Sequence, residues 1–214
     1  MCDRNLAISV AKELLDIKAV FLRPSEPFTW ASGIKSPIYC DNRMTLANPT
    51  SRKIIANGMA SVIKRYFPTC EVIMGAATGG IPHATLTAEL LNLPSGYVRS
   101  DLKSHGRNNQ IEGASVNSKK VIVIEDLIST AGSSVEVAKA LIEAGATVLA
   151  IISIVTYNLK SGIEKLKESK LINISLCDIN VLVDVAMDQG YISLKQKEMT
   201  LKFVNDPNDS LWMQ

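Results

Sequence analysis

Two adjacent acids and a run of small hydroxyl residues form the stretch of the chain with the clearest chemistry. Glu125 and Asp126 directly follow the β-branched residues 121–124, and Ser-Thr-Ala-Gly-Ser at 129–133 begins two residues later. Apolar residues at helical spacing come next, so the order is buried strand, small-residue turn and helix. Such a turn directs backbone N–H groups and hydroxyls at one point beside a helix N-terminus, which suits a phosphate group. The two acids suit sugar hydroxyls, or a metal ion, beside that phosphate.

An ordinary strand-to-helix turn, with Ser or Thr caps and a solvated acid pair, is the simpler explanation of this stretch. The order of its residues is more specific than that. A hydrophobic strand, Glu-Asp, two residues and Ser-Thr-Ala-Gly-Ser resembles the phosphoribosyl diphosphate (PRPP) motif of the type I phosphoribosyltransferases. The stretch lacks the Gly-Lys-Ser/Thr of a P-loop and the Gly-x-Gly-x-x-Gly of a dinucleotide-binding fold.

Two further loops contain residues suited to the same ligand. Residues 75–80 read Gly-Ala-Ala-Thr-Gly-Gly after a short predicted strand. Small residues there let the backbone approach a diphosphate, although a packing turn is the alternative. Residues 99–118 are polar and contain Arg99, Lys103 and His105, cations that would oppose the charge developing on a departing diphosphate. His83, beside Pro82, is more simply explained as a cap or a packed side chain.

The elements that must position these loops alternate along the chain. Strands are predicted over 71–75, 95–99, 121–124, 146–155 and 171–176, with helices between them. This alternation predicts an α/β fold, with a mainly parallel twisted sheet and helices on both faces, as in type I phosphoribosyltransferases. Residues 1–48 are expected to form an N-terminal helix (5–22) and a small hood with a hairpin-like element (28–43). Residues 49–214 are expected to form the core, ending in helices over 178–189 and 194–205, and the whole to be one compact structural unit.

Composition narrows the class of protein. The 214 residues suffice for one sizeable α/β domain, and a net charge of +2 with interspersed signs does not indicate a nucleic-acid surface. The longest apolar stretch, 144–155, is too short to span a bilayer, and the N-terminus has no signal-peptide pattern. The four cysteines form no Cys-x-x-Cys pair and the two histidines offer no zinc-ligand spacing. We therefore expect a cytoplasmic protein with free thiols.

Two segments resemble one family in particular. Phe-Thr-Trp-Ala-Ser-Gly-Ile-Lys-Ser-Pro-Ile-Tyr-Cys-Asp-Asn-Arg at 28–43 and Arg-Ser-Asp-Leu-Lys-Ser-His-Gly at 99–106 are similar to the orotate phosphoribosyltransferases. The similarity extends over about residues 5–205. It implies transfer of phosphoribosyl from PRPP to orotate, giving orotidine 5'-monophosphate and diphosphate, in the synthesis of pyrimidine nucleotides (UMP). It also implies Mg²⁺ held mainly by PRPP rather than by protein ligands, and a homodimer with shared active sites.

The resemblance also implies roles for individual residues. Lys103, His105, Glu125 and Asp126 are the expected catalytic residues, and Ser129 and Tyr39 are expected to contact orotate. The PRPP site is expected to comprise Arg99, Lys103, His105, Glu125, Asp126, Leu127, Ile128, Ser129, Thr130, Ala131, Gly132 and Ser133.

This chain departs from the pattern best known in the family at several positions. Ala31, Gly79 and Ser100 stand where many members have lysine, and Asn158 lies near where some use arginine on orotate. The group that holds the orotate carboxylate is left open between Lys35 and Arg43.

Two other functions share the PRPP motif. A purine phosphoribosyltransferase would not need Ser-Gly-x-x-Ser-Pro at 32–37. A PRPP-sensing regulator would need a DNA-binding domain, and residues 1–48 offer no basic recognition helix.

Overall fold

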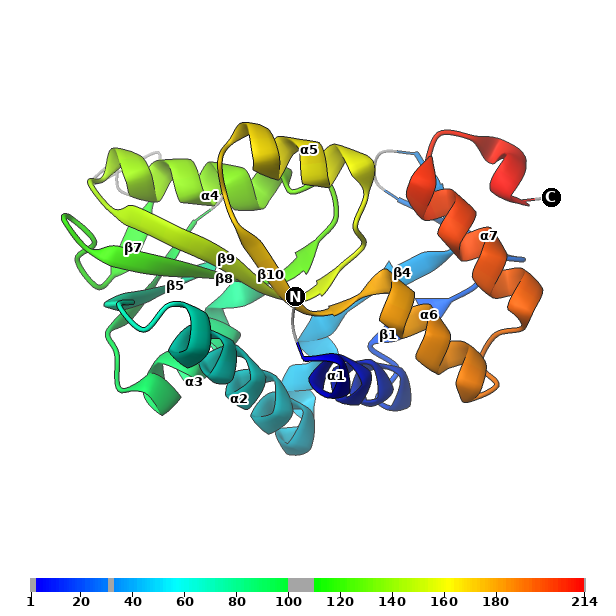
Figure 1. Cartoon of the computed structure of the whole chain (residues 1–214), viewed down its shortest axis with the longest axis horizontal. Helices are drawn as coiled ribbons and strands as arrows, with labels where there is room; N and C mark the ends of the chain where they lie inside the picture. Colours follow the sequence, from blue (N-terminus) through cyan, green and yellow to red (C-terminus); the bar gives the residue numbers. More distant parts are fainter. Residues whose placement is uncertain (1–2, 31–32, 100–109, 214) are drawn as a thin grey trace.

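A six-stranded sheet with helices on both sides forms the centre of the computed structural model, which describes residues 3–30, 33–99 and 110–213 (Figure 1). The strand order is β10-β9-β8-β5-β6-β7, and every neighbouring pair is parallel except β6 and β7. The predicted α/β class with a mainly parallel sheet is confirmed. The strands are β5 (Val72–Ala76), β6 (Ser95–Val98), β7 (Ile111–Gly113), β8 (Lys120–Ile128), β9 (Thr147–Thr156) and β10 (Asn173–Asp178).

The strand β8 carries the acid pair near the middle of this sheet. The predicted end at Ile124 is wrong, because the strand continues through the acids to Ile128. Pairing with the ten-residue β9 explains the difference, since Glu125 lies opposite Ser153 and Ile128 opposite Thr156. The acids therefore stand on a paired strand rather than in a turn.

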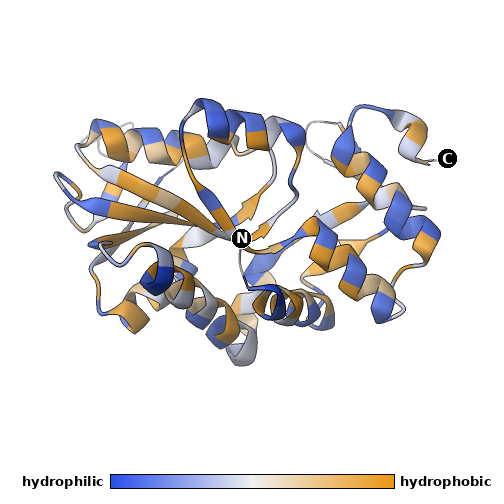
Figure 2. Cartoon of the chain, viewed as in Figure 1, coloured by the Kyte–Doolittle hydropathy of each residue, from blue (hydrophilic) through white to orange (hydrophobic). Residues whose placement is uncertain are grey.

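Helices cover both faces of the sheet. Successive residues of β8 point to opposite sides, so its apolar run presents apolar side chains to both faces. Ile122 and Ile124 belong to one apolar core, with residues of α1 (Arg4–Asp16), α2 (Pro49–Tyr66) and α3 (Gly80–Leu91). Val121 and Val123 belong to the other core, with residues of α4 (Gly132–Glu143) and α5 (Lys160–Glu168). Figure 2 shows apolar residues along the strands and on the inner sides of the helices.

The N-terminal part differs in detail from the prediction. The helix α1 ends at Asp16, not near residue 22, because Lys18 turns the chain with a φ of 55°. The strand β1 (Val20–Leu22) then pairs antiparallel with β4 (Ile38–Cys40). The predicted hairpin is present as β2 (Phe28–Thr29) and β3 (Lys35–Ser36), and the 3-10 helix η1 (Asn42–Ala47) leads into the core.

The C-terminal helices pack against this N-terminal part. They are α6 (Ile179–Asp188), α7 (Leu194–Asn205) and the 3-10 helix η2 (Ser210–Met213). The Trp30 ring stacks on Tyr157, with centroids 6.0 Å apart, and meets Phe203 edge-on at 5.7 Å. Aromatic contacts thus join the hood, the end of β9 and α7. Across the described ranges, no helix combines the length and apolarity that a membrane span requires.

Candidate functional site

The loops that follow β5, β6 and β8 meet at one end of the sheet. These three strands are neighbours and run parallel, so their carboxyl ends share an edge. Ligands of open α/β sheets bind outside that edge. The predicted convergence of residues 75–80, the base of the polar segment at Arg99, and the stretch 125–133 is confirmed for the described residues.

The turn at 129–133 ends in a helix N-terminus that no side chain caps. Ala131 adopts a left-handed conformation with a φ of 59°, and α4 begins at Gly132 without a side-chain hydrogen bond at its cap. The first N–H groups of a helix have no partner within the helix. The alternative of a Ser- or Thr-capped turn therefore does not hold here, and the amides at the start of α4 remain available to an anion.

The Glu125 side chain faces α4 and is almost entirely buried. The Ser134 hydroxyl donates to its Oε2 at 2.9 Å, and the Asp126 N–H donates to its Oε1 at 3.1 Å. Burial, together with the neighbouring Asp126 carboxylate, raises the pKa of Glu125 from its ordinary value of 4.5 to about 8. The pair thus carries less charge at neutral pH than two free carboxylates. The Ser134 hydroxyl, one residue beyond the predicted turn, is thus bound to Glu125.

The Asp126 side chain lies against the loop that follows β5. A Cβ atom added at Gly79 would stand 2.7 Å from Asp126 Oδ1, so the carboxylate occupies the space of a side chain there. The Asp126 carbonyl oxygen accepts a hydrogen bond of 2.8 Å from the Nδ2 of Asn42, which is buried at the start of η1. Asp126 is therefore fixed between the hood and the 75–80 loop.

Glycines allow the 75–80 loop to lie this close to β8. A Cβ at Gly80 would collide with the Ile124 carbonyl oxygen, and one at Gly75 would stand 2.7 Å from the Ile81 Cα. The peptide bond between Ala77 and Thr78 is cis. The sequence identified these residues by their size, and the structure places them beside the acid pair.

The segment with the predicted loop cations begins at Arg99. Its N–H donates to the Gln110 carbonyl at 2.9 Å, and β7 follows at Ile111, antiparallel to β6. The expectation of a long loop through residue 118 is therefore wrong, since part of it forms a sheet strand. Lys103 and His105 lie outside the described residues.

The hood carries Tyr39, Arg43 and Lys35, and of these two cations Arg43 is the one that Asp126 influences electrostatically. The Tyr39 ring is 41% exposed and lies 5.6 Å from the Phe28 ring. Asp41 accepts from the Nε and Nη2 of Arg43 at 2.7 and 3.0 Å, and this contact, with smaller effects of Tyr39 and Asp126, raises the pKa of Arg43. The Lys35 ammonium donates instead to the Thr29 hydroxyl at 2.7 Å.

His83 is a packed side chain, as predicted, but it also joins a hydrogen-bonded chain that the sequence did not reveal. Thr45 Oγ1 donates to the Asn42 carbonyl at 2.5 Å, so it accepts from His83 Nε2 at 3.4 Å. Burial lowers the pKa of His83 to about 4, and its Nδ1 has no hydrogen-bond partner among the described residues. The chain links α3, η1 and, through Asn42, the Asp126 carbonyl.

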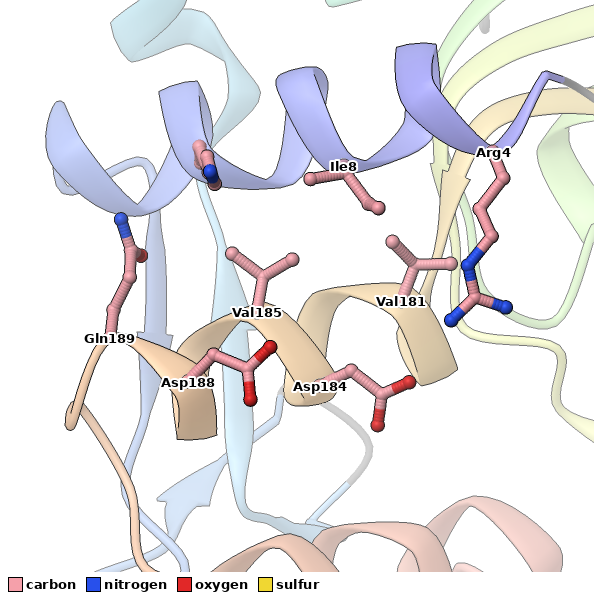
Figure 3. Close-up of a pocket in the computed structure, with 8 residues that line it drawn as sticks. Arg4, Ile8, Val181, Asp184, Val185, Asp188 and Gln189 are labelled. Atoms are coloured by element: carbon pink, nitrogen blue, oxygen red, sulfur yellow. The ribbon is translucent and has the colours of Figure 1, made fainter.

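Two further features lie outside this arrangement. Within residues 3–30, 33–99 and 110–213, no cluster of three or more His, Cys, Asp or Glu side chains is arranged to hold a metal ion. A groove between α1 and α6 (Figure 3) has Ile8, Val181 and Val185 pointing toward one another, with Arg4 and Asp184 at one end. Its lining contains none of the acid pair or the phosphate turn.

Comparison with known proteins agrees with this geometry. The phosphoribosyl transferase domain family matches residues 42–189. The orotate phosphoribosyltransferase of Bacillus cereus is 49% identical over 204 residues, 95% of this chain and 97% of that protein. The enzyme of the same name from Enterococcus faecalis is 50% identical, covering 96% and 98%. The crystal structure of orotate phosphoribosyltransferase from Aeropyrum pernix matches with a TM-score of 0.72 at 26% identity, over 86% of this chain and 99% of that one. The chain therefore belongs to the phosphoribosyl transferase domain family and, within it, to the orotate phosphoribosyltransferases.

Proposed function

We propose that this protein transfers phosphoribosyl from PRPP to orotate, giving orotidine 5'-monophosphate and diphosphate. The observation that carries the proposal is the uncapped N-terminus of α4 beside the Asp126–Gly79 contact. A phosphate bound at that helix end would place the attached ribose over β8 and its diphosphate toward the 75–80 loop. The choice of orotate as the acceptor is supported by the relatives that are 49% and 50% identical to this chain, which are orotate phosphoribosyltransferases. We place this reaction in UMP synthesis in the cytoplasm.

In this proposal the PRPP ribose 5-phosphate lies in the turn 129–133, and Leu127 and Ile128 support that turn from β8. The amides at the start of α4 hold the phosphate oxygens, because they have neither helical nor side-chain partners. The residues Ser129, Thr130 and Ser133 add hydroxyl donors.

The acid pair, Glu125 and Asp126, is assigned to the ribose of PRPP. Burial raises the pKa of Glu125 to about 8, so this carboxyl keeps a proton at neutral pH. The Asp126 carboxylate lies beside the 75–80 loop, where the proposal places the diphosphate. A charge at that place stabilises the electron-poor sugar carbon that forms as diphosphate leaves. Glu125 helps to position Asp126, because its Oε1 accepts a hydrogen bond of 3.1 Å from the Asp126 backbone N–H.

Mg²⁺ is proposed as the cofactor, held mainly by oxygens of PRPP. The donor set fits, because Asp126 offers a carboxylate beside the loop assigned to the diphosphate and Mg²⁺ prefers oxygen ligands. When bound, the ion neutralises charge on the departing diphosphate. Arg99, Lys103 and His105 are proposed to act on the same charge. We propose that they act across a homodimer interface, each subunit completing its partner's site.

For orotate, Tyr39 and Ser129 are the proposed ring contacts, and Arg43 the proposed carboxylate ligand. Arg43 is favoured over Lys35 because its pKa responds to both Tyr39 and Asp126, which indicates that it lies near them. Asp41 fixes the guanidinium through Nε and Nη2 and leaves Nη1 to a planar carboxylate.

One assay tests the proposal. Purified protein with PRPP and Mg²⁺ should consume orotate, followed by the loss of its ultraviolet absorbance, and release diphosphate. Adenine, hypoxanthine and uracil serve as acceptor controls. Consumption of a purine in place of orotate would contradict the proposal, and so would PRPP binding without turnover of any acceptor.

A further inference from the structure

The helix α5 packs directly on the phosphate turn. A Cβ atom at Gly162, in the first turn of α5, would collide with the Ser129 carbonyl oxygen. Only glycine fits this approach without displacing the Ser129 backbone. Helices α4 and α5 lie on the same face of the sheet and contact each other (Figure 1). The position of α5 is thus tied to the turn.

This packing brings a lysine to the start of α4. The Lys165 Nζ lies 3.6 Å from the position that a Cβ atom would take at Gly132, the first residue of α4. Within the described part of the chain, the Lys165 ammonium forms no ion pair and no hydrogen bond with a protein group. Its charge stands beside amides that also have no partner.

We propose that Lys165 binds the 5'-phosphate of PRPP and of the nucleotide product. The inference rests on the proposed function, since it assigns a further residue to the same phosphate subsite. Three kinds of hydrogen-bond donor would then surround the phosphate: the α4 amides, the hydroxyls of the turn, and the Lys165 ammonium from a different helix. The absence of a side chain at Gly132 leaves the ammonium direct access to the phosphate.

The test compares Lys165→Gln with Lys167→Gln. Both lysines lie in the last turn of α5, and both changes remove one positive charge from the same helix. For Lys165→Gln we expect the dissociation constant of PRPP, measured by calorimetry, to rise roughly three- to tenfold, because one charge-assisted contact is lost. The KM for PRPP should rise with it while kcat changes little. Lys167→Gln should match the wild type.

The reverse reaction supplies an internal control. Orotidine 5'-monophosphate carries the 5'-phosphate and free diphosphate does not, so Lys165→Gln should raise the KM of the nucleotide only. Lys165→Arg, which keeps the charge, should restore most of the lost affinity. Equal effects of Lys165→Gln and Lys167→Gln, or an unchanged PRPP dissociation constant, would overturn the inference. An altered diphosphate KM with an unaltered nucleotide KM would also overturn it. Calorimetry with PRPP alone needs no turnover of orotate, so this result stays separate from that of the proposed function.

Discussion

The Asp126 carboxylate fills the space that a side chain at Gly79 would occupy: an added Cβ would stand 2.7 Å from its Oδ1. The Gly79 backbone is in the ordinary right-handed helical region, with a φ of −66° and a ψ of −32°. Alanine would therefore cause no backbone strain at this position. The three atoms nearest to an added methyl group at residue 79 all belong to the Asp126 carboxylate, so the methyl group would displace that side chain.

Gly79→Ala and Asp126→Asn should therefore act on one interaction. We expect Asp126→Asn to lower kcat more than it raises the KM values, with a loss of about 2–4 kcal/mol of transition-state stabilisation. Gly79→Ala should lower kcat in the same way. In the double variant the two losses should not add, because the introduced asparagine no longer supplies the charge whose position Gly79 permits. Wild-type turnover of Asp126→Asn, or strictly additive losses, would contradict the assignment.

Asn42→Ala should weaken both stability and turnover. The change removes the donor to the Asp126 carbonyl and leaves a polar atom unpaired in a part-buried place. We expect a loss of about 1–3 kcal/mol in the free energy of unfolding, measured by urea denaturation, and a reduced kcat. Asn57→Ala is the matched control, because the Asn57 Nδ2 bonds a backbone carbonyl on the exposed side of α2. A wild-type kcat for Asn42→Ala would show that the hood does not position Asp126.

Glu125→Gln should change how stability depends on pH. Between its unfolded pKa near 4.5 and its folded pKa of about 8, Glu125 binds more proton in the folded state than in the unfolded state. This group therefore makes the free energy of unfolding fall as pH rises, by up to about 1.4 kcal/mol per pH unit. Glutamine keeps an acceptor for the Ser134 hydroxyl and removes the titration.

The measurement for Glu125→Gln is urea denaturation at pH 5, 6, 7 and 8. The free energy of unfolding of the variant, relative to that of the wild type, should increase from pH 5 to pH 8. Glu71→Gln is the control, because hydrogen bonding from the Lys120 N–H, followed by Lys119, lowers the pKa of that exposed carboxylate. Glu71 should therefore change the pH dependence of the free energy of unfolding only in solutions more acidic than this series. Parallel curves for Glu125→Gln and the wild type would refute the protonated state of Glu125.

Arg43→Gln should raise the KM of orotate roughly tenfold, because a charge-assisted contact to the carboxylate is lost. The KM of PRPP should change much less. Lys35→Gln is the matched control from the same hood, since its ammonium bonds a neutral hydroxyl. An orotate KM raised by Lys35→Gln and not by Arg43→Gln would exchange the two assignments.

The proposed shared sites predict recovery of activity from two inactive parents. Lys103→Ala removes a loop cation and Asp126→Ala damages the acid pair. If sites are shared, a mixed dimer contains one site with both defects and one with neither. Equal random mixing should recover about a quarter of wild-type activity, since roughly half the dimers are mixed and each has one intact site. No recovery, with subunit exchange verified by an affinity tag, would refute shared sites.

The repeating parts of this fold were predictable from local pattern, whereas the environment of the site was not. Uninterrupted apolar runs and turn residues located β5, β8 and β9, and glycine content located the 75–80 loop. The extension of β8 to Ile128 depends on pairing with β9, and β7 consists of only Ile111–Gly113 beside β6. No local pattern in the sequence marks either.

Long-range contacts account for what was missed in the site. Asn42 and Asp126 are 84 positions apart, and neither residue type predicts their hydrogen bond. Glu125 and Asp126 are adjacent in sequence, but only the packing of α4 makes one of them buried and bound to Ser134. The sequence could identify the two acids, but it could not show that Glu125 is the one buried against α4.

The antiparallel stem of β6 and β7 has a consequence for how this molecule can be altered. Arg99 and Gln110 are joined by a backbone hydrogen bond, so the chain leaves the sheet and re-enters it at the same place. The register of β6 against β7 is set by residues on either side of the intervening segment, and the entropic cost of a longer connection grows only slowly with length. Reporter peptides or reactive handles could therefore be built in at this point, next to the proposed cations, while the rest of the scaffold keeps its sequence.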